Sequence, residues 1–213
     1  MDGVIVDSLK HHVEASRLFA ERHGIQLSGK EIRDKYFGRR NQDWMPELFG
    51  DKLTMEEMKI LADEKEAVFR EIFEPDIRLM DGLLELLQDL KEHHIPMIVG
   101  SSAPGENIAF VLEKTGVASF FKGYLDDSRV SNGKPDPEIY IKSAEAIGLP
   151  PEKCVVIEDS PAGIESGKRA GAKVIGITTT QPREKLPPTD LTIDSFYELS
   201  YQKIRELFSE NNS

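Results

Sequence analysis

Cysteine is nearly absent from this sequence, since Cys154 is the only one among 213 residues. A single thiol cannot form an internal disulfide, so the composition carries no mark of an oxidising compartment. No apolar run approaches the roughly 18 residues that a membrane-spanning helix needs, and the N-terminus lacks the basic and then apolar pattern of a signal peptide. We therefore expect a cytoplasmic protein that does not bind membranes.

Positive charge is also scarce. The 27 Lys and Arg residues stand against 38 Asp and Glu residues, which gives a net charge of −11. A field of that sign repels nucleic acid and argues against DNA or RNA partners. It also repels anionic metabolites at long range, so a phosphate site would need local positive charge, and a bound cation is one source of it. With 39% hydrophobic and 31% charged residues, the composition is that of a globular protein.

The pattern of apolar residues changes near Pro75. Before it, from about His12, we expect only helices, and the longest of them begins with the capping-box pair Thr54 and Glu57. Beyond it, short apolar runs alternate with amphipathic helices, the last predicted over residues 195–208, and this alternation is typical of parallel strands joined by helices. The strands that we expect comprise residues 95–99, 123–125, 154–157, 174–177 and 191–193.

This order predicts an α/β fold: a doubly wound, mostly parallel sheet with an inserted helical cap. We assign residues 1–11 and 76–213 to the α/β core and residues 12–75 to the cap. Ligands of open α/β sheets bind at the carboxyl ends of the strands. The candidate site residues are therefore those that directly follow strands.

Two such segments carry groups that can hold anions. Ser101 and Ser102 follow the 95–99 strand, where their hydroxyl and backbone N–H groups could hold an anion or could serve only as a helix cap. Lys134 lies in a Gly-Lys-Pro-Asp-Pro segment, whose prolines restrict the backbone around one ammonium group. The same segment also suits a plain turn into a helix.

Two further segments carry carboxylates. Asp2 precedes Gly3 in a predicted tight turn, and an N-terminal turn with an aspartate of no functional role would show the same pattern. Glu158 and Asp159 directly follow the 154–157 strand, where two adjacent carboxylates are costly without a partner. Mg²⁺ prefers oxygen ligands and would offset that cost, although an exposed turn with an acidic cap would read the same way. Together, an acid, a hydroxyl, a lysine and an acid pair at one edge of a sheet match the needs of phosphoryl transfer.

The segments MDGVIVDS, VGSS, GKPDPEIY and VIEDSPAGI resemble, in order and spacing, the motifs of the haloacid dehalogenase (HAD) superfamily, in particular its β-phosphoglucomutase-like branch. The resemblance covers essentially the whole chain. It implies that Asp2 is the general acid and base. It also implies that Ser101 and the Ser102 N–H bind the phosphoryl group, and that Lys134 neutralises the nucleophile and the phosphate.

The resemblance further implies a metal cofactor and substrate contacts from the cap. Glu158 and Asp159, together with the backbone carbonyl of Asp2, match the residues that hold Mg²⁺ in the family. His12 and Lys65 match positions at which related sugar-phosphate enzymes contact the substrate. A plain helix histidine and a solvated lysine would look the same in the sequence.

Two features depart from the family's pattern. The family's nucleophilic aspartate lies two positions before the residue that Asp2 matches, so it would precede Met1, together with a central strand whose loss would leave strand edges unpaired. We expect the natural polypeptide to carry an upstream strand that ends in this aspartate. In the cap loop 38–41, the arginine of the mutase aligns with Asn41, while Arg39 and Arg40 just before it could reach an anionic substrate or stay exposed.

The activity that the resemblance implies is Mg²⁺-dependent hydrolysis of a small phosphate monoester, such as a sugar phosphate, through an aspartyl-phosphate intermediate. A phosphosugar mutase would use the same site and return the phosphate to its substrate. A dehalogenase fits less well, because its chemistry does not need an acid pair suited to Mg²⁺. A non-catalytic protein that keeps the metal and phosphate site without the nucleophile is the alternative from another class. The expected partner is a small phosphorylated metabolite, and the expected assembly is a monomer or a small homo-oligomer.

Overall fold

The computed structural model describes residues 1–36, 39–50 and 53–209. It divides the chain into two compact units. Met1–Asp7 and Arg78–Ser213 form the first, which we call the core unit, and Ser8–Ile77 forms the second, which we call the cap unit. The cap unit therefore begins at residue 8 rather than 12 and ends at residue 77 rather than 75.

The cap unit is built from helices around an aromatic core. Capping boxes start two of them, because the Ser28 and Thr54 hydroxyls accept from the N–H groups of Glu31 and Glu57, whose carboxylates accept from the cap residues in return. Their buried residues cluster as Phe19, Ile32, Tyr36, Trp44 and Met45. The elements are α1 (Leu9–Arg22), α2 (Gly29–Glu31), the π-helix η1 (Ile32–Tyr36), α3 (Asn41–Phe49), α4 (Met55–Phe73) and η2 (Glu74–Asp76).

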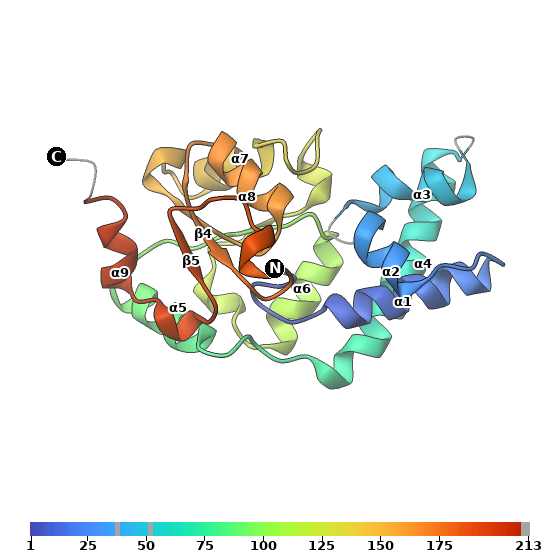
Figure 1. Ribbon diagram of the computed structural model, residues 1–213, viewed down its shortest axis with the longest axis horizontal. Coiled ribbons are helices and arrows are strands. Elements are labelled where there is room, and N and C mark those ends of the chain that lie inside the picture. Colours follow the sequence, from blue (N-terminus) through green and yellow to red (C-terminus); the bar gives the residue numbers. More distant parts are fainter. Residues whose placement is uncertain (37–38, 51–52, 210–213) are drawn as a thin grey trace. The chain divides into compact units, whose positions relative to one another are not determined.

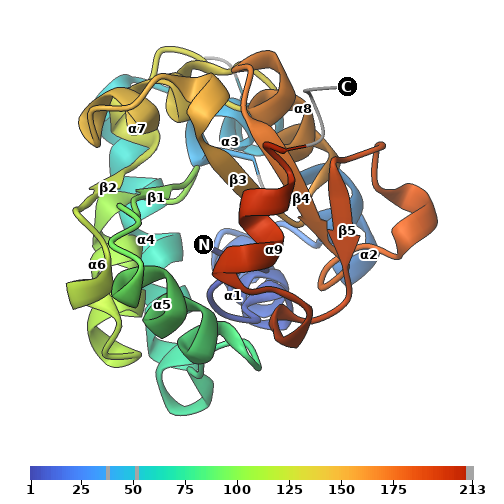
Figure 2. The same ribbon diagram turned by 90° about the vertical axis from the view of Figure 1, so that its left-hand side faces the viewer.

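The core unit contains parallel strands, and this confirms the predicted α/β class. Its strands are β1 (Val99–Gly100), β2 (Tyr124–Leu125), β3 (Val155–Glu158), β4 (Lys173–Ile177) and β5 (Leu191–Ile193). They form two sheets, β1–β2 and β3–β4–β5, and every strand pair in both is parallel. Figure 2 shows both sheets with the label of the N-terminus between them. The carboxyl ends of β3 and β4 lie level, since Glu158 pairs with Gly176.

Helices of the core unit pack on these sheets. Helix α8 lies beside β4 (Figure 1), and its Ile164 is buried with Val156 of β3 and Val174 of β4. The helices are α5 (Leu83–Glu92), α6 (Gly105–Lys114), α7 (Glu138–Ala146), α8 (Pro161–Arg169) and α9 (Tyr201–Glu206), with short 3₁₀ turns η3 (Ala118–Phe120), η4 (Asp127–Arg129), η5 (Pro151–Lys153), η6 (Arg183–Lys185) and η7 (Phe196–Glu198). None of the helices in the described ranges has both the length and the apolar content to cross a bilayer.

The single helix predicted over residues 195–208 is wrong. The structure has the short turn η7 and then α9, because Leu199 and Ser200 are extended between them. Two serines compete as helix starts: the Ser195 hydroxyl accepts from Tyr197 N–H, and the Ser200 hydroxyl accepts from Lys203 N–H. The amphipathic pattern continued through this break, so it concealed the second cap.

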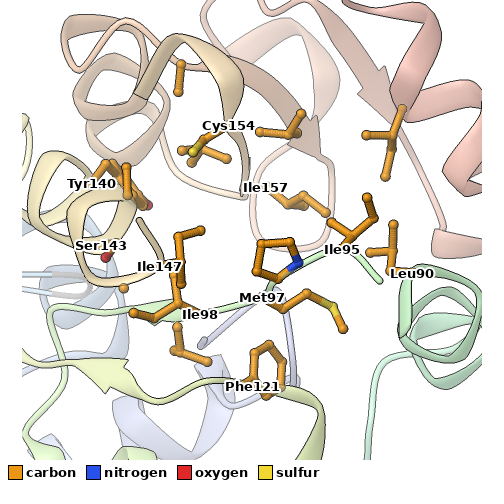
Figure 3. Close-up of a pocket in the computed structure, with 18 of the residues that line it drawn as sticks. Leu90, Ile95, Met97, Ile98, Phe121, Tyr140, Ser143, Ile147, Cys154 and Ile157 are labelled. Carbon is orange, nitrogen blue, oxygen red and sulfur yellow. The ribbon is translucent and has the colours of Figure 1, made fainter. Parts of the chain in front are cut away.

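An apolar cavity of about 450 Å³ lies between the two sheets. Figure 3 shows Ile98 beside β1, Ile157 of β3 and residues of α5 and α7 in its lining. Met1 and residues of α9 line it as well. Cys154, just before β3, also lines this cavity. In the part of the chain that the structure describes, β1 pairs with β2 alone and β3 with β4 alone, so each has one strand edge without a partner strand.

Candidate active site

The carboxyl end of β3 brings the acid pair to the predicted lysine. Glu158 ends β3 and Asp159 follows it, and both are almost completely buried. Lys134 precedes α7, and its ammonium group forms an ion pair with Glu158. The peptide bond between Lys134 and Pro135 is cis. The structure therefore joins two of the segments that the sequence singled out.

Hydrogen bonds surround the Glu158 carboxylate. Its Oε1 accepts from the Lys134 ammonium and from the Tyr140 hydroxyl. Its Oε2 accepts from Asp159 N–H at 3.1 Å, from Ser160 N–H at 3.3 Å and from the Ser160 hydroxyl at 3.0 Å. Burial alone would raise the pKa of Glu158, but the Lys134 charge and the hydrogen bonds outweigh it and lower the pKa to about 2.

Asp159 lies in a contrasting environment. Burial and the neighbouring Glu158 charge raise the pKa of Asp159 to about 7, against a hydrogen bond of 2.6 Å that the Thr180 hydroxyl donates to its Oδ2. A Cβ atom on Gly3, whose φ is +69°, would lie 2.1 Å from that oxygen, so only glycine allows this approach. The Thr179 hydroxyl donates to the Gly3 carbonyl. The loop after β4 thus ties the N-terminal turn to the acid pair.

Asp2 belongs to this N-terminal turn. It is the residue before Gly3, whose N–H donates to the Val6 carbonyl at 2.8 Å, and Asp2 itself forms a β-bridge with Val6. Because the Gly3 backbone contacts Asp159 and Thr180, the Asp2 backbone lies near the acid pair. The structure thereby gathers three of the four segments at the carboxyl ends of β3 and β4.

The fourth segment follows β1. Ser101 is buried, and its hydroxyl accepts from Ala103 N–H at 3.1 Å, while Ser102 is partly exposed. A Cβ on Gly100 would lie 3.6 Å from the Tyr140 ring, so the end of β1 lies against the tyrosine that hydrogen-bonds the acid pair. Gly100, the residue before Ser101, thus brings this segment to Tyr140, which in turn contacts the acid pair.

The cap unit holds a buried polar cluster of its own. Lys65 is only 6% exposed, so it is not a solvated lysine, and its ammonium lies 2.7 Å from Glu66 Oε1. Asn41 Nδ2 donates to the same oxygen at 2.8 Å. Burial would raise the pKa of Glu66, but the charges of Lys65 and His12 and the hydrogen bonds lower it to about 2. The His12 ring stacks on Phe69 with centroids 3.7 Å apart.

The two cap arginines are paired with carboxylates. Arg40 is nearly buried, and its Nε and Nη2 donate to the two oxygens of Asp43 at 2.8 and 2.9 Å. Arg39 donates to Glu47 at 2.7 Å and to a backbone carbonyl at 3.0 Å. These contacts fix the start of α3. Gly38, in the same loop, lies outside the described residues.

The donor set at the acid pair suits a hard cation such as Mg²⁺. The atoms there that could bind a metal ion are all oxygens. A buried carboxylate beside a like charge, as at Asp159, is stabilised by a cation. Within residues 1–36, 39–50 and 53–209, no group of three His, Cys, Asp or Glu side chains could hold a metal ion. Mg²⁺ nevertheless fits, because it binds through one or two carboxylates and takes its other ligands from water and substrate phosphate.

Sequence reasoning missed three polar residues of these sites. Tyr140 lies in the GKPDPEIY segment, in which the sequence pattern points only to Lys134. Thr180 follows the 174–177 strand closely, so the strand-end criterion that found Ser101 could have found it as well. Glu66 had no signal, because neighbouring residues on a helix do not face each other as a rule.

The core is a parallel α/β unit whose strand ends gather carboxylates, a lysine and hydroxyl groups, and a helical segment is inserted early in the chain. These features are those of the α/β hydrolases that act on phosphate groups. The profile of the haloacid dehalogenase-like hydrolase family matches residues 1–177. The chain belongs to this family, in its β-phosphoglucomutase-like branch. The predicted resemblance and fold class are thereby confirmed.

Individual relatives match nearly the whole chain. Validoxylamine A 7'-phosphate phosphatase of Streptomyces hygroscopicus subsp. limoneus is 30% identical over 205 residues, which cover 96% of this chain and 95% of that protein. The phosphorylated carbohydrates phosphatase of Thermotoga maritima is 31% identical over 179 residues, which cover 82% and 81%. The crystal structure of β-phosphoglucomutase from Clostridium difficile superposes with a TM-score of 0.86 at 27% identity, covering 98% of this chain and 94% of that one.

Proposed function

We propose that the protein is a Mg²⁺-dependent phosphatase that hydrolyses a small phosphate monoester, such as a sugar phosphate, through an aspartyl-phosphate intermediate. The observation that carries this proposal is the convergence of Lys134, the acid pair and the Asp2–Gly3 turn at the carboxyl ends of β3 and β4. The two relatives named as phosphatases support the reaction class.

The nucleophile in this proposal is an aspartate on a strand that precedes Met1 and lies between β1 and β3. The support is the apolar cavity between the two sheets, which has a strand edge without a partner strand on either side within the described ranges. A strand buried on both faces needs such apolar walls, and Ile98 and Ile157 supply them here. Since Met1 lines the same cavity, a strand leading into it would continue directly into the Asp2 turn.

The reaction has two displacements. In the first, the aspartate oxygen bonds to phosphorus while the bond to the leaving oxygen breaks, and Asp2 gives that oxygen a proton. In the second, Asp2 takes a proton from water, whose oxygen bonds to phosphorus as the aspartyl bond breaks. Lys134 and Ser101 stabilise negative charge on the transferring group. Mg²⁺, held by Glu158, Asp159 and the Asp2 carbonyl, would supply further charge neutralisation.

The cap residues complete the proposal. His12, Lys65, Arg39, Arg40 and Asn41 are candidates for contacts with the leaving group, as the resemblance implies. The pairing of Arg39 and Arg40 with Glu47 and Asp43 would have to loosen or be shared if either guanidinium binds an anionic substrate.

A phosphosugar mutase is the second candidate, favoured by the similarity to β-phosphoglucomutase. It differs from a phosphatase in the fate of the phosphoryl group. A mutase would interconvert phosphosugar isomers without net release of phosphate and would be activated by a bisphosphate. Both outcomes can be read in the same assay.

The test is a phosphate-release screen over many monoesters, with Mg²⁺ and with a chelator. The protein is the full chain extended ahead of Met1 by a Val- and Ile-rich strand that ends in Asp two positions before Asp2. The matched control carries Asn at that one position. We expect release that requires Mg²⁺ and is lost in the Asn control, in Lys134→Ala and in Asp159→Asn. Equal release with the Asn control, or release unaffected by both substitutions, would contradict the mechanism.

A further inference from the structure

Glu158 is only 5% exposed, although the residue also lines the apolar cavity between the sheets. Besides the donors at its two oxygens, the first turn of α8 lies directly against its carboxylate. A Cβ on Gly163 would lie 2.0 Å from Glu158 Cδ and 2.2 Å from each oxygen. Gly163 is therefore needed to let the carboxylate approach the N-terminus of α8, where the peptide dipoles favour negative charge.

Its hydrogen-bonding capacity is also used up. Two carboxylate oxygens offer about four lone-pair positions. Glu158 accepts from five donors: the Lys134 ammonium, the Tyr140 hydroxyl, the N–H groups of Asp159 and Ser160, and the Ser160 hydroxyl. A cation at either oxygen would have to displace one of these donors, two of which are backbone groups fixed by β3 and α8.

Asp159 differs in this respect. Of the residues that the structure describes, only Thr180 donates to its carboxylate, through one hydroxyl to Oδ2. Within the described residues Asp159 forms no ion pair, although the charges of the N-terminus and of Lys134 act to lower its pKa, whereas Glu158 pairs directly with Lys134. The two neighbouring acids therefore have different chemical capacities: one is saturated with donors, and the other can still bind a cation.

We propose that Glu158 orients Lys134 and does not bind the metal ion through its carboxylate, and that Tyr140 is a positioning residue that holds Glu158 in this arrangement. The proposal rests on the proposed function and refines it, because it leaves Asp159 as the acid of the pair that binds Mg²⁺. It also departs from the assignment of Glu158 as a metal ligand that the resemblance implied.

Tyr140 suits this role through two contacts. Its hydroxyl donates to the same oxygen that accepts from Lys134, and the Lys134 ammonium lies 4.9 Å from the centroid of its ring. The ring thus covers the ammonium while the hydroxyl fixes the oxygen that the ammonium contacts. Lys134, Glu158 and Tyr140 form one unit in which the lysine has a defined direction.

Thermal unfolding of the full chain without metal separates the two roles of Glu158. Acids that gather around a metal repel each other when it is removed, so replacing one of them should raise the Tm. A buried partner of Lys134 behaves in the opposite way, because its replacement leaves a buried ammonium unpaired. We expect Glu158→Gln to lower the Tm and Asp159→Asn to raise it. A higher Tm for Glu158→Gln would overturn the proposal.

Mn²⁺ binding, followed by the electron paramagnetic resonance signal of the free ion, is the second measurement. We expect Asp159→Asn to weaken binding at least about tenfold more than Glu158→Gln does. Equal weakening by both variants would overturn the proposal. If neither variant weakens binding, the assignment of Glu158 stands, and the metal site of the proposed function fails instead.

Nuclear magnetic resonance of the lysine ammonium groups tests whether Tyr140 positions Glu158 and Lys134. It also keeps the arrangement of Lys134, Glu158 and Tyr140 testable if Glu158→Gln does not fold. A buried, hydrogen-bonded ammonium exchanges slowly, so Lys134 should give a signal that Lys134→Met removes. We expect Tyr140→Phe to broaden that signal, while Tyr197→Phe, which removes an exposed hydroxyl, leaves it unchanged. An unchanged signal in Tyr140→Phe would reduce Tyr140 to a packing residue and overturn its part in the proposal.

Discussion

The contact between Gly3 and the acid pair can be measured through Gly3→Ala. Gly3 has a φ of +69°, and its added Cβ would lie 2.1 Å from Asp159 Oδ2 and 2.7 Å from Thr180 Cγ2. Gly116 is the matched control, because its φ is +73° and nothing lies within 4 Å of an added Cβ. The difference between the two alanine variants therefore isolates the contact from the backbone strain.

The expected magnitudes follow from this pairing. Gly116→Ala should lower the free energy of unfolding by about 1–2 kcal/mol, the cost of a left-handed conformation for an L-residue. Gly3→Ala should cost this amount and about 1–3 kcal/mol more, because the Asp159 carboxylate must move away from its Thr180 donor. The total expected for Gly3→Ala is thus about 2–5 kcal/mol.

Urea unfolding followed by circular dichroism is the appropriate assay. Tryptophan fluorescence is not, because Trp44 is the one tryptophan of the sequence and belongs to the cap unit, whereas Gly3 belongs to the core unit. If Gly3→Ala proves no more destabilising than Gly116→Ala, the N-terminal turn does not contact Asp159, and the convergence on which the proposed function rests is refuted.

Two further predictions concern buried polar pairs. Lys65→Met should lower stability by about 3–5 kcal/mol in chemical denaturation, because it leaves the Glu66 carboxylate buried without its cation. Because folding lowers the pKa of Glu66 from 4.5 to about 2, the ionised carboxylate stabilises the folded protein above pH 4.5, and this contribution is lost as the pH falls towards 2. The acid-induced loss of stability should be smaller in Lys65→Met, and an unchanged pH profile would contradict the pairing. Thr180→Val should cost about 1–3 kcal/mol in the same assay by removing the donor to Asp159, while Thr180→Ser should retain most of the stability; equal losses would contradict the hydrogen bond.

Local patterns predicted the fold well where the decisive interactions are local. The predicted capping box at Thr54 and Glu57 is present, and it starts the longest helix before Pro75, α4. The two-serine break before α9 shows the limit of this approach. Amphipathic spacing reports which face is buried, but two successive caps change the backbone without changing that spacing.

The candidate site divides in the same way. Acids and hydroxyls that follow strands can be found from sequence, because parallel strands place their carboxyl ends at one edge. The hydrogen bonds that surround the Glu158 carboxylate could not be predicted in this way, because its donors Lys134 and Tyr140 reach it only after α7 packs beside β3. The ion pair of Lys65 and Glu66 was not predicted for another reason. Both residues are buried in one helix, a position that charged residues rarely adopt unless they are paired.

The position of Cys154 has a practical consequence. This thiol lines the apolar cavity between the sheets, is the one cysteine of the chain, and has a pKa that partial burial and the Glu152 charge raise. A thiol of raised pKa reacts slowly, and a strand lying against it would slow the reaction further by shielding the sulfur. The rate at which this sulfur is alkylated therefore reports whether the cavity is occupied, and it can be measured without any substrate.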